Sequence, residues 1–422
     1  MPALAIYPIN MQQHKPVCIH KLKYWFVVCV ALMINNFSFI GTSHAESSHF
    51  GTCVAGLQAK ARNEGISENT VHQVLGKVKH IPRIIELDRR QPEFTQTFAH
   101  YFNVRVSDQR IQRGRELLHE HQMLLERIQQ ETGVSAKYLV SFWGLETNYG
   151  GYFGDWTVPD SLTTLACDPR RSDFFTQELL NAMRILDAGD VSPERMIGSW
   201  AGAMGHMQFM PSTFLRYAKD ADGDGRRDLW GSIPDAMVSA ANFLQQLGWV
   251  RGLDWGFEVL VPDDFDYSLA GRNKTLSLDE WAKLGITIVT EHSLYPEHQL
   301  SLLVPAGYQG PAFLITKNFH IIMRWNRSEF YALSVGHLAD RIAGAPTLQR
   351  NISSDDARIS REQVRQLQQD LTALGLDAGP ADGIMGSKTR QAITRFQQNN
   401  QRIADGHMDA ELLTIIREAA PN

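Results

Sequence analysis

The chain has 422 residues, of which 43% are hydrophobic, so it is long enough and apolar enough to form two or three domains with buried cores. Its 41 basic and 46 acidic residues give a formal net charge of −5, which excludes the basic character typical of nucleic-acid-binding proteins. We therefore expect a folded protein that has no nucleic-acid partner.

The first 45 residues have the organisation of a secretory signal peptide. Basic residues at 20–23 precede an apolar run at 24–34, and small residues surround Ala45, after which we expect cleavage. A membrane anchor is the alternative, but the apolar run is shorter than the roughly 18 residues that a spanning helix requires. Cys29 lacks the small residues that precede a lipid-modified cysteine. We expect a soluble exported protein without a transmembrane anchor, and no lipoprotein.

Cleavage would remove Cys18 and Cys29 and leave Cys53 and Cys167 as a pair. An even number of cysteines in an oxidising compartment favours a disulfide between them. Two separately buried thiols are the alternative.

Glu146 is the first candidate for chemistry. An apolar helical run at 138–145 precedes it and a glycine-containing turn follows. Phe142 and Trp143 lie on the same helix face, so the carboxyl group is partly desolvated but still reachable. A glutamic acid that keeps its proton near neutral pH can donate it to a leaving oxygen, as glycosidic bond cleavage requires. The alternative is a carboxylate that only accepts hydrogen bonds at a helix end.

Residues 198–212 read Gly-Ser-Trp-Ala-Gly-Ala-Met-Gly-His-Met-Gln-Phe-Met-Pro-Ser. Small residues alternate there with Met, Trp and Phe, which lets the backbone approach a ligand while aromatic and thioether groups line a cleft. Gln208 is the one amide in this run and can bind hydroxyl or acetamido groups. The alternative is a helix packing site with Gln208 on the surface.

The Glu146 and Gln208 segments together resemble the lytic murein transglycosylases of the membrane-bound type B family. The resemblance extends over nearly all of the mature chain and includes residues 90–94, 144–150, and 325–328 with Tyr331. It implies a lysozyme-like core and an enzyme in the periplasm of a Gram-negative bacterium. It also implies a set of residues that hold the glycan: Ser199, Gln208, Phe209, Trp325, Asn326 and Tyr331. Trp325 stands where relatives often have tyrosine.

The resemblance also implies a mechanism with one carboxyl group. Glycosidases ordinarily use two, and no second motif of this kind accompanies Glu146. The N-acetyl group of the substrate would act as nucleophile, and Glu146 would then activate the sugar's own 6-hydroxyl. The product would be a 1,6-anhydromuramic acid end, formed by cleavage between N-acetylmuramic acid and N-acetylglucosamine without a cofactor. A hydrolytic muramidase of the lysozyme type and a non-catalytic peptidoglycan-binding scaffold are the alternatives.

Residues 220–228 carry acidic side chains at alternate positions and glycine at the sixth, like the first half of a calcium-binding EF-hand loop. Position twelve, normally glutamate, is Gly231, and Asp235 is placed to complete the shell, as an acidic residue nearby does in related transglycosylases. The expected metal residues are Asp220, Asp222, Asp224, Arg226 and Asp235. The sequence predicts a structural calcium ion of weak affinity, with a solvated acidic turn as the alternative.

The expected fold class is α+β and mainly α. Short apolar runs between Trp255 and Lys317, with proline and glycine between them, predict a small β-subdomain inserted in the helical core. We expect the catalytic domain at 46–344 and, because large apolar residues are scarce there, a linker at 345–357.

Residues 358–420 are expected to form a separate domain. Ser360 and Gln363 predict a capping box, and Ala-Asp-Gly occurs at both 381–383 and 404–406. This duplication resembles the three-helix peptidoglycan-binding domain of type 1, while a generic helical bundle is the alternative. Such a domain would hold the enzyme on peptidoglycan glycan strands. Other cell-wall enzymes are further expected partners.

Overall fold

The computed structural model describes residues 41–90, 96–290, 294–352 and 359–421. Residues 1–40 of the predicted signal peptide and residues 91–94 of the family motif lie outside this part. The chain divides into two units, Met1–His49 and Phe50–Asn422, and the second contains the elements below except for the first turns of the first helix, which begins at Gly41. Among the described residues, no helix combines the length and the apolar character needed to cross a membrane.

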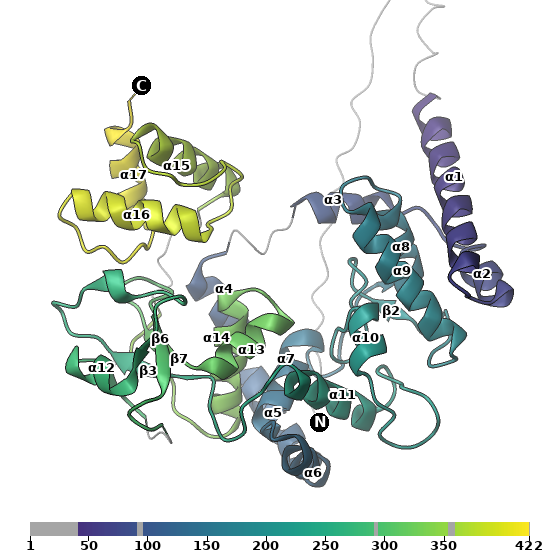
Figure 1. The fold of residues 1–422 in the computed structure, drawn as a ribbon, viewed down its shortest axis with the longest axis horizontal. Coiled ribbons are helices and arrows are strands. Elements are labelled where there is room, and N and C mark those ends of the chain that lie inside the picture. The colour runs from purple at the N-terminus through teal and green to yellow at the C-terminus, as the bar shows by residue number, and fades with distance from the viewer. Residues whose placement is uncertain (1–40, 91–95, 291–293, 353–358, 422) are drawn as a thin grey trace, which may run out of the picture. The chain divides into compact units, whose positions relative to one another are not determined.

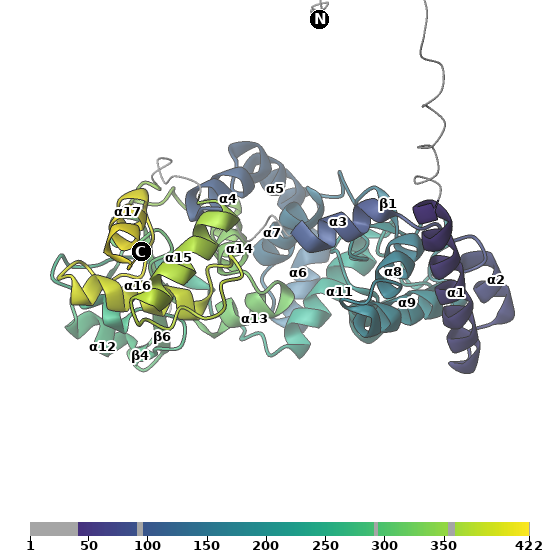
Figure 2. The same cartoon turned by 90° about the horizontal axis from the view of Figure 1, so that it is seen from above.

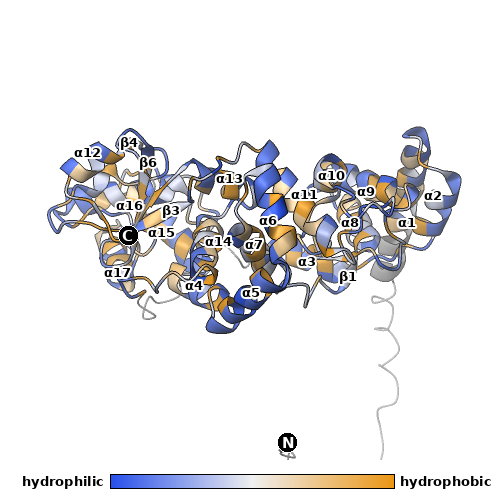
Figure 3. Ribbon diagram, turned by 90° about the horizontal axis from the view of Figure 1, so that it is seen from below, coloured by the Kyte–Doolittle hydropathy of each residue, from blue (hydrophilic) through white to orange (hydrophobic). Residues whose placement is uncertain are grey.

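Helix α7 (Ala136–Thr147) forms the centre of the larger helical group. Its residues 138–144 are all buried, because apolar side chains occupy almost every face of this helix. Helices α5 (Asp108–Glu120), α6 (Gln122–Thr132), α11 (Ile233–Gln246) and α14 (Glu329–Ile342) pack against it, and α4 (Phe98–Arg105) and α13 (Lys317–Trp325) pack on α14. These helices can be followed in Figures 1 and 2. In Figure 3, α7 is coloured mainly hydrophobic and α5 mainly hydrophilic, as expected for a central and a peripheral helix.

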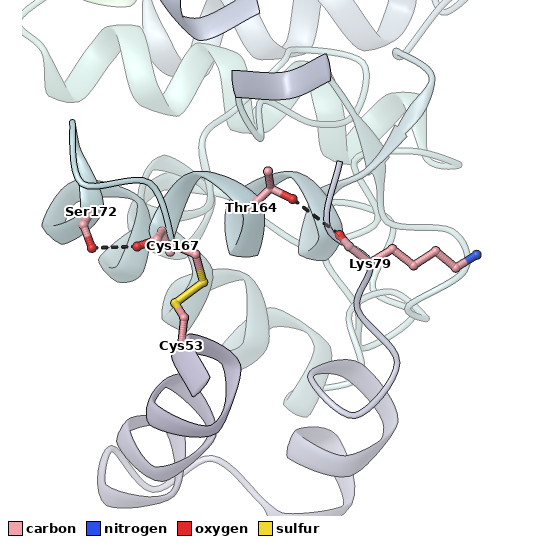
Figure 4. The surroundings of a disulfide bond; sticks show 6 residues. Cys53, Lys79, Thr164, Cys167 and Ser172 are labelled. Atoms are coloured by element: carbon pink, nitrogen blue, oxygen red, sulfur yellow. Dashed lines mark hydrogen bonds between the residues drawn. A yellow bond between two sulfur atoms is a disulfide. The ribbon is translucent and has the colours of Figure 1, made fainter. Parts of the chain in front are cut away.

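A second helical group packs around the pair α8 (Val158–Ala166) and α9 (Ser172–Asp187), which lie side by side in Figure 1. Its other members are α2 (Glu68–Val74), α3 (Pro82–Arg90) and α10 (Pro211–Tyr217). Helix α1 (Gly41–Asn63) is joined to α8 by a disulfide between Cys53 and Cys167 (Figure 4).

The β-subdomain is a five-stranded sheet with the strand order β4-β6-β7-β3-β5. All four pairings are antiparallel, and Phe257 of β3 stands opposite Leu314 of β7. The elements are β3 (Gly256–Leu260), η2 (Tyr267–Leu269), β4 (Leu276–Ser277), α12 (Leu278–Lys283), β5 (Thr287–Ile288), β6 (Gln299–Leu303) and β7 (Ala312–Ile315). Trp281 and Leu302 are fully buried in its separate core. The predicted inserted subdomain and the mainly helical fold class are therefore confirmed.

Lys137 at the start of α7 connects the sheet to the helical core. Its Nζ donates to Asp254 at 2.7 Å and to Asp340 of α14 at 2.8 Å. The indole of Trp255, just before β3, also donates to Asp340 at 2.8 Å. Because one cation serves two carboxylates, the subdomain is held at a fixed place on α7 and α14.

The C-terminal domain contains α15 (Arg361–Ala373), α16 (Ser387–Asn399) and α17 (Ala410–Ala419), which Figure 1 shows as a small three-helix unit. The predicted capping box of Ser360 and Gln363 is present. The two Ala-Asp-Gly turns are built alike: Asp382 accepts a hydrogen bond from Gln368, and Asp405 accepts one from Gln397. The duplication in sequence is thus a duplication in structure.

The first half of the predicted linker lies against the catalytic core. The buried carboxylate of Glu258 accepts hydrogen bonds from the backbone N–H groups of Gln349 and Arg350 at 2.9 to 3.0 Å. Leu348 and Ile352 pack on the helical core. The chain therefore stays on the core up to residue 352, and residues 353–358 lie outside the described part.

Candidate active site

Glu146 lies in the last turn of α7, where the chain then turns through two residues in the left-handed conformation, Asn148 (φ 50°) and Tyr149 (φ 61°). Such residues cost conformational energy and are concentrated at functional sites. The hydroxyl of Tyr331, from α14, donates a hydrogen bond to Oε1 of Glu146. Glu146 is half-buried, so the residue is not sealed from solvent.

The surroundings of Glu146 raise its pKa to about 7, and the main cause is desolvation. Hydrogen bonds from the side chains of Tyr331 and Trp325 and the charge of Arg105 act in the opposite direction. None of these three groups is a carboxylate. The arrangement provides one acid that is substantially protonated near neutral pH.

An aromatic cluster lies beside Glu146. The Trp325 ring lies 4.4 Å from Phe142 and 5.3 Å from Phe209, measured between centroids. Phe209 and Tyr331 are only 2% and 4% exposed, and their expected contact with the glycan stays a prediction. Phe209 supports Trp325, and Tyr331 contacts Glu146. Trp325 is partly exposed, and Asn326, which follows α13, is exposed.

The Gln208 segment is a strained loop and not a helix. Gln208 has φ 46°, and its Nε2 donates to the carbonyls of Phe153 and Gly205, each at 3.1 Å. Ser199 accepts a hydrogen bond from the backbone N–H of Ala203 at 3.0 Å. Strand β2 (Ile197–Gly198) of this segment pairs with β1 (Trp156–Thr157), which follows the Glu146 turn. The alternative of a helix packing site is therefore wrong.

His206 is a positioning residue that the sequence reasoning missed. Its Nδ1 accepts a hydrogen bond from Trp143 at 2.9 Å, and its carbonyl accepts one from Thr147 at 3.0 Å. Burial lowers the pKa of His206 to about 4, so the imidazole stays neutral and able to accept. His206 thereby joins the end of α7 to the Gln208 loop. His206 is the one imidazole in a run of small residues, and this position could have marked it in the sequence as a candidate.

Three predicted metal residues converge. Carboxylate oxygens of Asp220, Asp222 and Asp235 lie within 4.8 Å of one another, and Asp235 is fully buried. Burial raises the pKa of Asp235. Asp224 is outside this cluster and pairs with Arg226 at 3.1 Å, because its side chain turns toward the guanidinium. Hard oxygen donors at this spacing fit a calcium ion.

Residues 49–340 match the family described as "Transglycosylase SLT domain", and residues 360–416 match "Putative peptidoglycan binding domain". The membrane-bound lytic murein transglycosylase B of Escherichia coli K12 is 30% identical over 300 residues, which are 68% of this chain and 81% of that protein.

Solved structures with the same fold include SltB3 of Pseudomonas aeruginosa in complex with NAG-anhNAM-pentapeptide. It is 42% identical, with a TM-score of 0.84 over 87% of this chain and 99% of that one. The Escherichia coli lytic transglycosylase Slt35 in complex with calcium is 28% identical, with a TM-score of 0.61 over 69% of this chain and 92% of that one.

Proposed function

The chain belongs to the transglycosylase SLT family and is a lytic transglycosylase that cleaves the glycan of murein, and from this premise we propose how its site performs the cleavage. The bond cleaved is the β-1,4 linkage between N-acetylmuramic acid and N-acetylglucosamine. The product carries a 1,6-anhydromuramic acid end. One observation carries the proposal: Glu146 is an acid with a pKa near 7, and among the described residues no carboxylate belongs to the groups that set this pKa.

In the first step the Glu146 carboxyl donates its proton to the glycosidic oxygen, and the bond from that oxygen to C1 breaks. The acetamido carbonyl oxygen of the muramic acid unit forms a bond to C1 in place of an enzyme carboxylate. In the second step the Glu146 carboxylate takes the proton of the 6-hydroxyl, whose oxygen attacks C1 and releases the acetamido group. Glu146 recovers its proton, and no water is consumed.

The amide of Gln208 and the exposed Asn326 are proposed to orient the acetamido group, with Ser199 on the same loop as a further polar contact. Trp325 is proposed to stack against a sugar ring, because its indole is partly exposed and is supported by Phe142 and Phe209. A hydrolytic muramidase would use Glu146 in the same way but admit water, so the chemistry of the product separates the two reactions.

Product analysis tests this proposal. Purified sacculi are digested with the enzyme, and the released muropeptides are analysed by mass spectrometry. Anhydro ends support the proposal, whereas reducing ends indicate a hydrolytic muramidase. If the sacculi lose neither turbidity nor mass, the protein is a binding scaffold and no enzyme.

Three further assignments complete the proposal. Asp220, Asp222 and Asp235 are proposed to hold a structural calcium ion, which takes no part in the chemistry. Residues 1–45 are proposed to be a signal peptide that directs the protein to the periplasm of a Gram-negative bacterium. The C-terminal domain is proposed to hold the enzyme on peptidoglycan, where other cell-wall enzymes also act.

A further inference from the structure

The loop at residues 150–155 connects the two segments to which the glycan contacts are assigned. The backbone N–H of Tyr152 donates to the carbonyl of Thr147, the residue after the catalytic acid, at 3.0 Å. The backbone carbonyl of Phe153 accepts a hydrogen bond from the side-chain amide of Gln208 at 3.1 Å. The loop is therefore tied on one side to the end of α7 and on the other to the Gln208 segment.

Gly154 brings this loop into close contact with the backbone next to Ser199. Its φ is 113°, in the region that favours glycine. A Cβ atom at this position would collide with the carbonyl oxygen of Gly198 and would lie 2.9 Å from the backbone nitrogen of Ser199. The close approach thus requires glycine, and it holds the loop beside a residue that is assigned to the glycan.

The side chain of Tyr152 is exposed although both of its ends are fixed. It is 58% exposed, and it is the one large apolar side chain of residues 148–155 that is open to solvent. Its hydroxyl donates to Oδ2 of Asp155 at 2.7 Å. Because the backbone and the hydroxyl are both hydrogen-bonded, a ligand that covers this ring would cost little side-chain entropy.

The ring of Tyr152 and the carboxylate of Asp155 offer two surfaces of different chemistry. A pyranose ring presents C–H groups on its face and hydroxyl groups on its edge. An aromatic ring can cover the C–H face, and a carboxylate that holds one donor has acceptor sites left for a sugar hydroxyl. The negative charge of Asp155 disfavours an anionic ligand, so a neutral sugar fits the pair better than a carboxylate does.

We propose that Tyr152 and Asp155 bind a sugar of the glycan strand beyond the two units joined by the scissile bond. The inference rests on the proposed function, which assigns those two units to Glu146, Gln208 and Asn326. Because these side chains hold the units at the bond, the pair on the adjoining loop is assigned to the next unit along the strand. It positions the strand and takes no part in the transfer of protons.

The test measures cleavage of a soluble glycan that extends several sugars past the scissile bond. Tyr152→Ala should raise KM about fivefold, given the strength of aromatic contacts. Its kcat should stay unchanged, because a contact outside the reacting units is equally strong in the ground state and in the transition state. Tyr152→Phe keeps the ring and should stay near the wild-type KM.

Two further comparisons separate the two surfaces from general effects. Asp155→Ala should raise KM, whereas Asp155→Asn keeps an acceptor oxygen and should raise it less. Tyr295→Ala is the matched control, because Tyr295 belongs to the β-subdomain, is 65% exposed and also stacks on a neighbouring side chain, that of His298. This variant should keep the wild-type KM.

An unchanged KM in Tyr152→Ala would overturn the inference. An equal rise in Tyr152→Phe would also overturn it, because the hydroxyl and the shape of the loop would then account for the effect. An equal rise in Tyr295→Ala would show that any exposed tyrosine has this effect, with the same conclusion. If Tyr152→Ala does not fold, Tyr152→Leu takes its place, since leucine keeps the apolar volume but has no flat ring.

Calorimetric titration of the same glycan into Glu146→Gln, with and without Tyr152→Ala, measures the contact without cleavage. The double variant should bind about fivefold more weakly. If this loss is found but the wild-type enzyme releases reducing ends, the proposed anhydro route fails and the sugar contact stands. If both proteins bind equally while the wild-type enzyme releases anhydro ends, the proposed function stands and the inference fails.

Discussion

The hydroxyl of Tyr331 donates a hydrogen bond to Oε1 of Glu146, although 185 residues separate them in the chain. This bond favours the charged form of the carboxyl group and so limits the rise of its pKa. Tyr331→Phe should therefore move the alkaline limb of the kcat/KM profile upward by roughly one pH unit, given the strength of a hydrogen bond to a charge. Tyr149→Phe, which removes a buried hydroxyl bonded to a backbone carbonyl, should leave the limb in place.

Glu146→Gln should lower turnover by at least about a hundredfold, since general acid catalysis typically contributes that much. Glutamine keeps the acceptor for Tyr331, so the fold and glycan binding should persist. The exposed Glu131→Gln serves as the control and should retain activity. Near wild-type cleavage by Glu146→Gln would show that another group supplies the proton.

The same substitution should change the pH dependence of stability. The folded state raises the pKa of Glu146 from 4.5 to about 7, so it binds more protons than the unfolded state between these values. The contribution of Glu146 to stability should therefore be largest below about pH 4.5 and should fall as the pH rises through 7. The difference in Tm between Glu146→Gln and the wild type should therefore change in favour of the variant between pH 5 and pH 8. A difference in Tm that stays constant over this range would contradict the raised pKa.

Calcium should raise the Tm of the wild-type protein by mass action on the native state. Asp222→Asn and Asp235→Asn should abolish this rise, because both residues belong to the carboxylate cluster. Asp224→Asn should reduce it less, because Asp224 is paired with Arg226. A Tm that does not respond to millimolar calcium would leave only an acidic turn.

Truncation after Ile352 should give a stable catalytic domain that still makes anhydro products from soluble glycans but binds sacculi less well. A protein truncated after Ile342 should have a lower Tm than the one truncated after Ile352, because the buried carboxylate of Glu258 loses its two backbone partners. Thermal unfolding of both proteins side by side measures the difference. Equal Tm values would mean that Glu258 finds other donors.

Much of this architecture could be predicted from local patterns. The run before Glu146 forms α7, and the capping box of Ser360 forms as expected. These features depend on neighbours three or four residues apart, which a sequence displays directly. Apolar residues recur at helical spacing on both sides of His121, but the chain breaks there into α5 and α6.

The parts that could not be predicted depend on residues far apart in sequence. Periodicity cannot show that the Tyr331 hydroxyl reaches Glu146, or that Trp143 donates to His206. The burial of Phe209 under Trp325 likewise depends on the packing of α13. The hydrogen bond from the backbone N–H of Gln349 to Glu258 fixes part of the expected linker on the core. Each is a tertiary contact that composition does not encode.

The left-handed backbone at Gln208 has an evolutionary consequence. Glycine would adopt φ 46° without the steric penalty of roughly 1 kcal/mol that a side chain incurs there. Glycine would also remove the amide proposed to hold the substrate's acetamido group. Glycine would lose in addition the two hydrogen bonds that this amide donates to Phe153 and Gly205, each worth roughly 1 kcal/mol. The strained backbone is therefore offset within the loop, and a library screened only for thermal stability should not replace this glutamine by glycine.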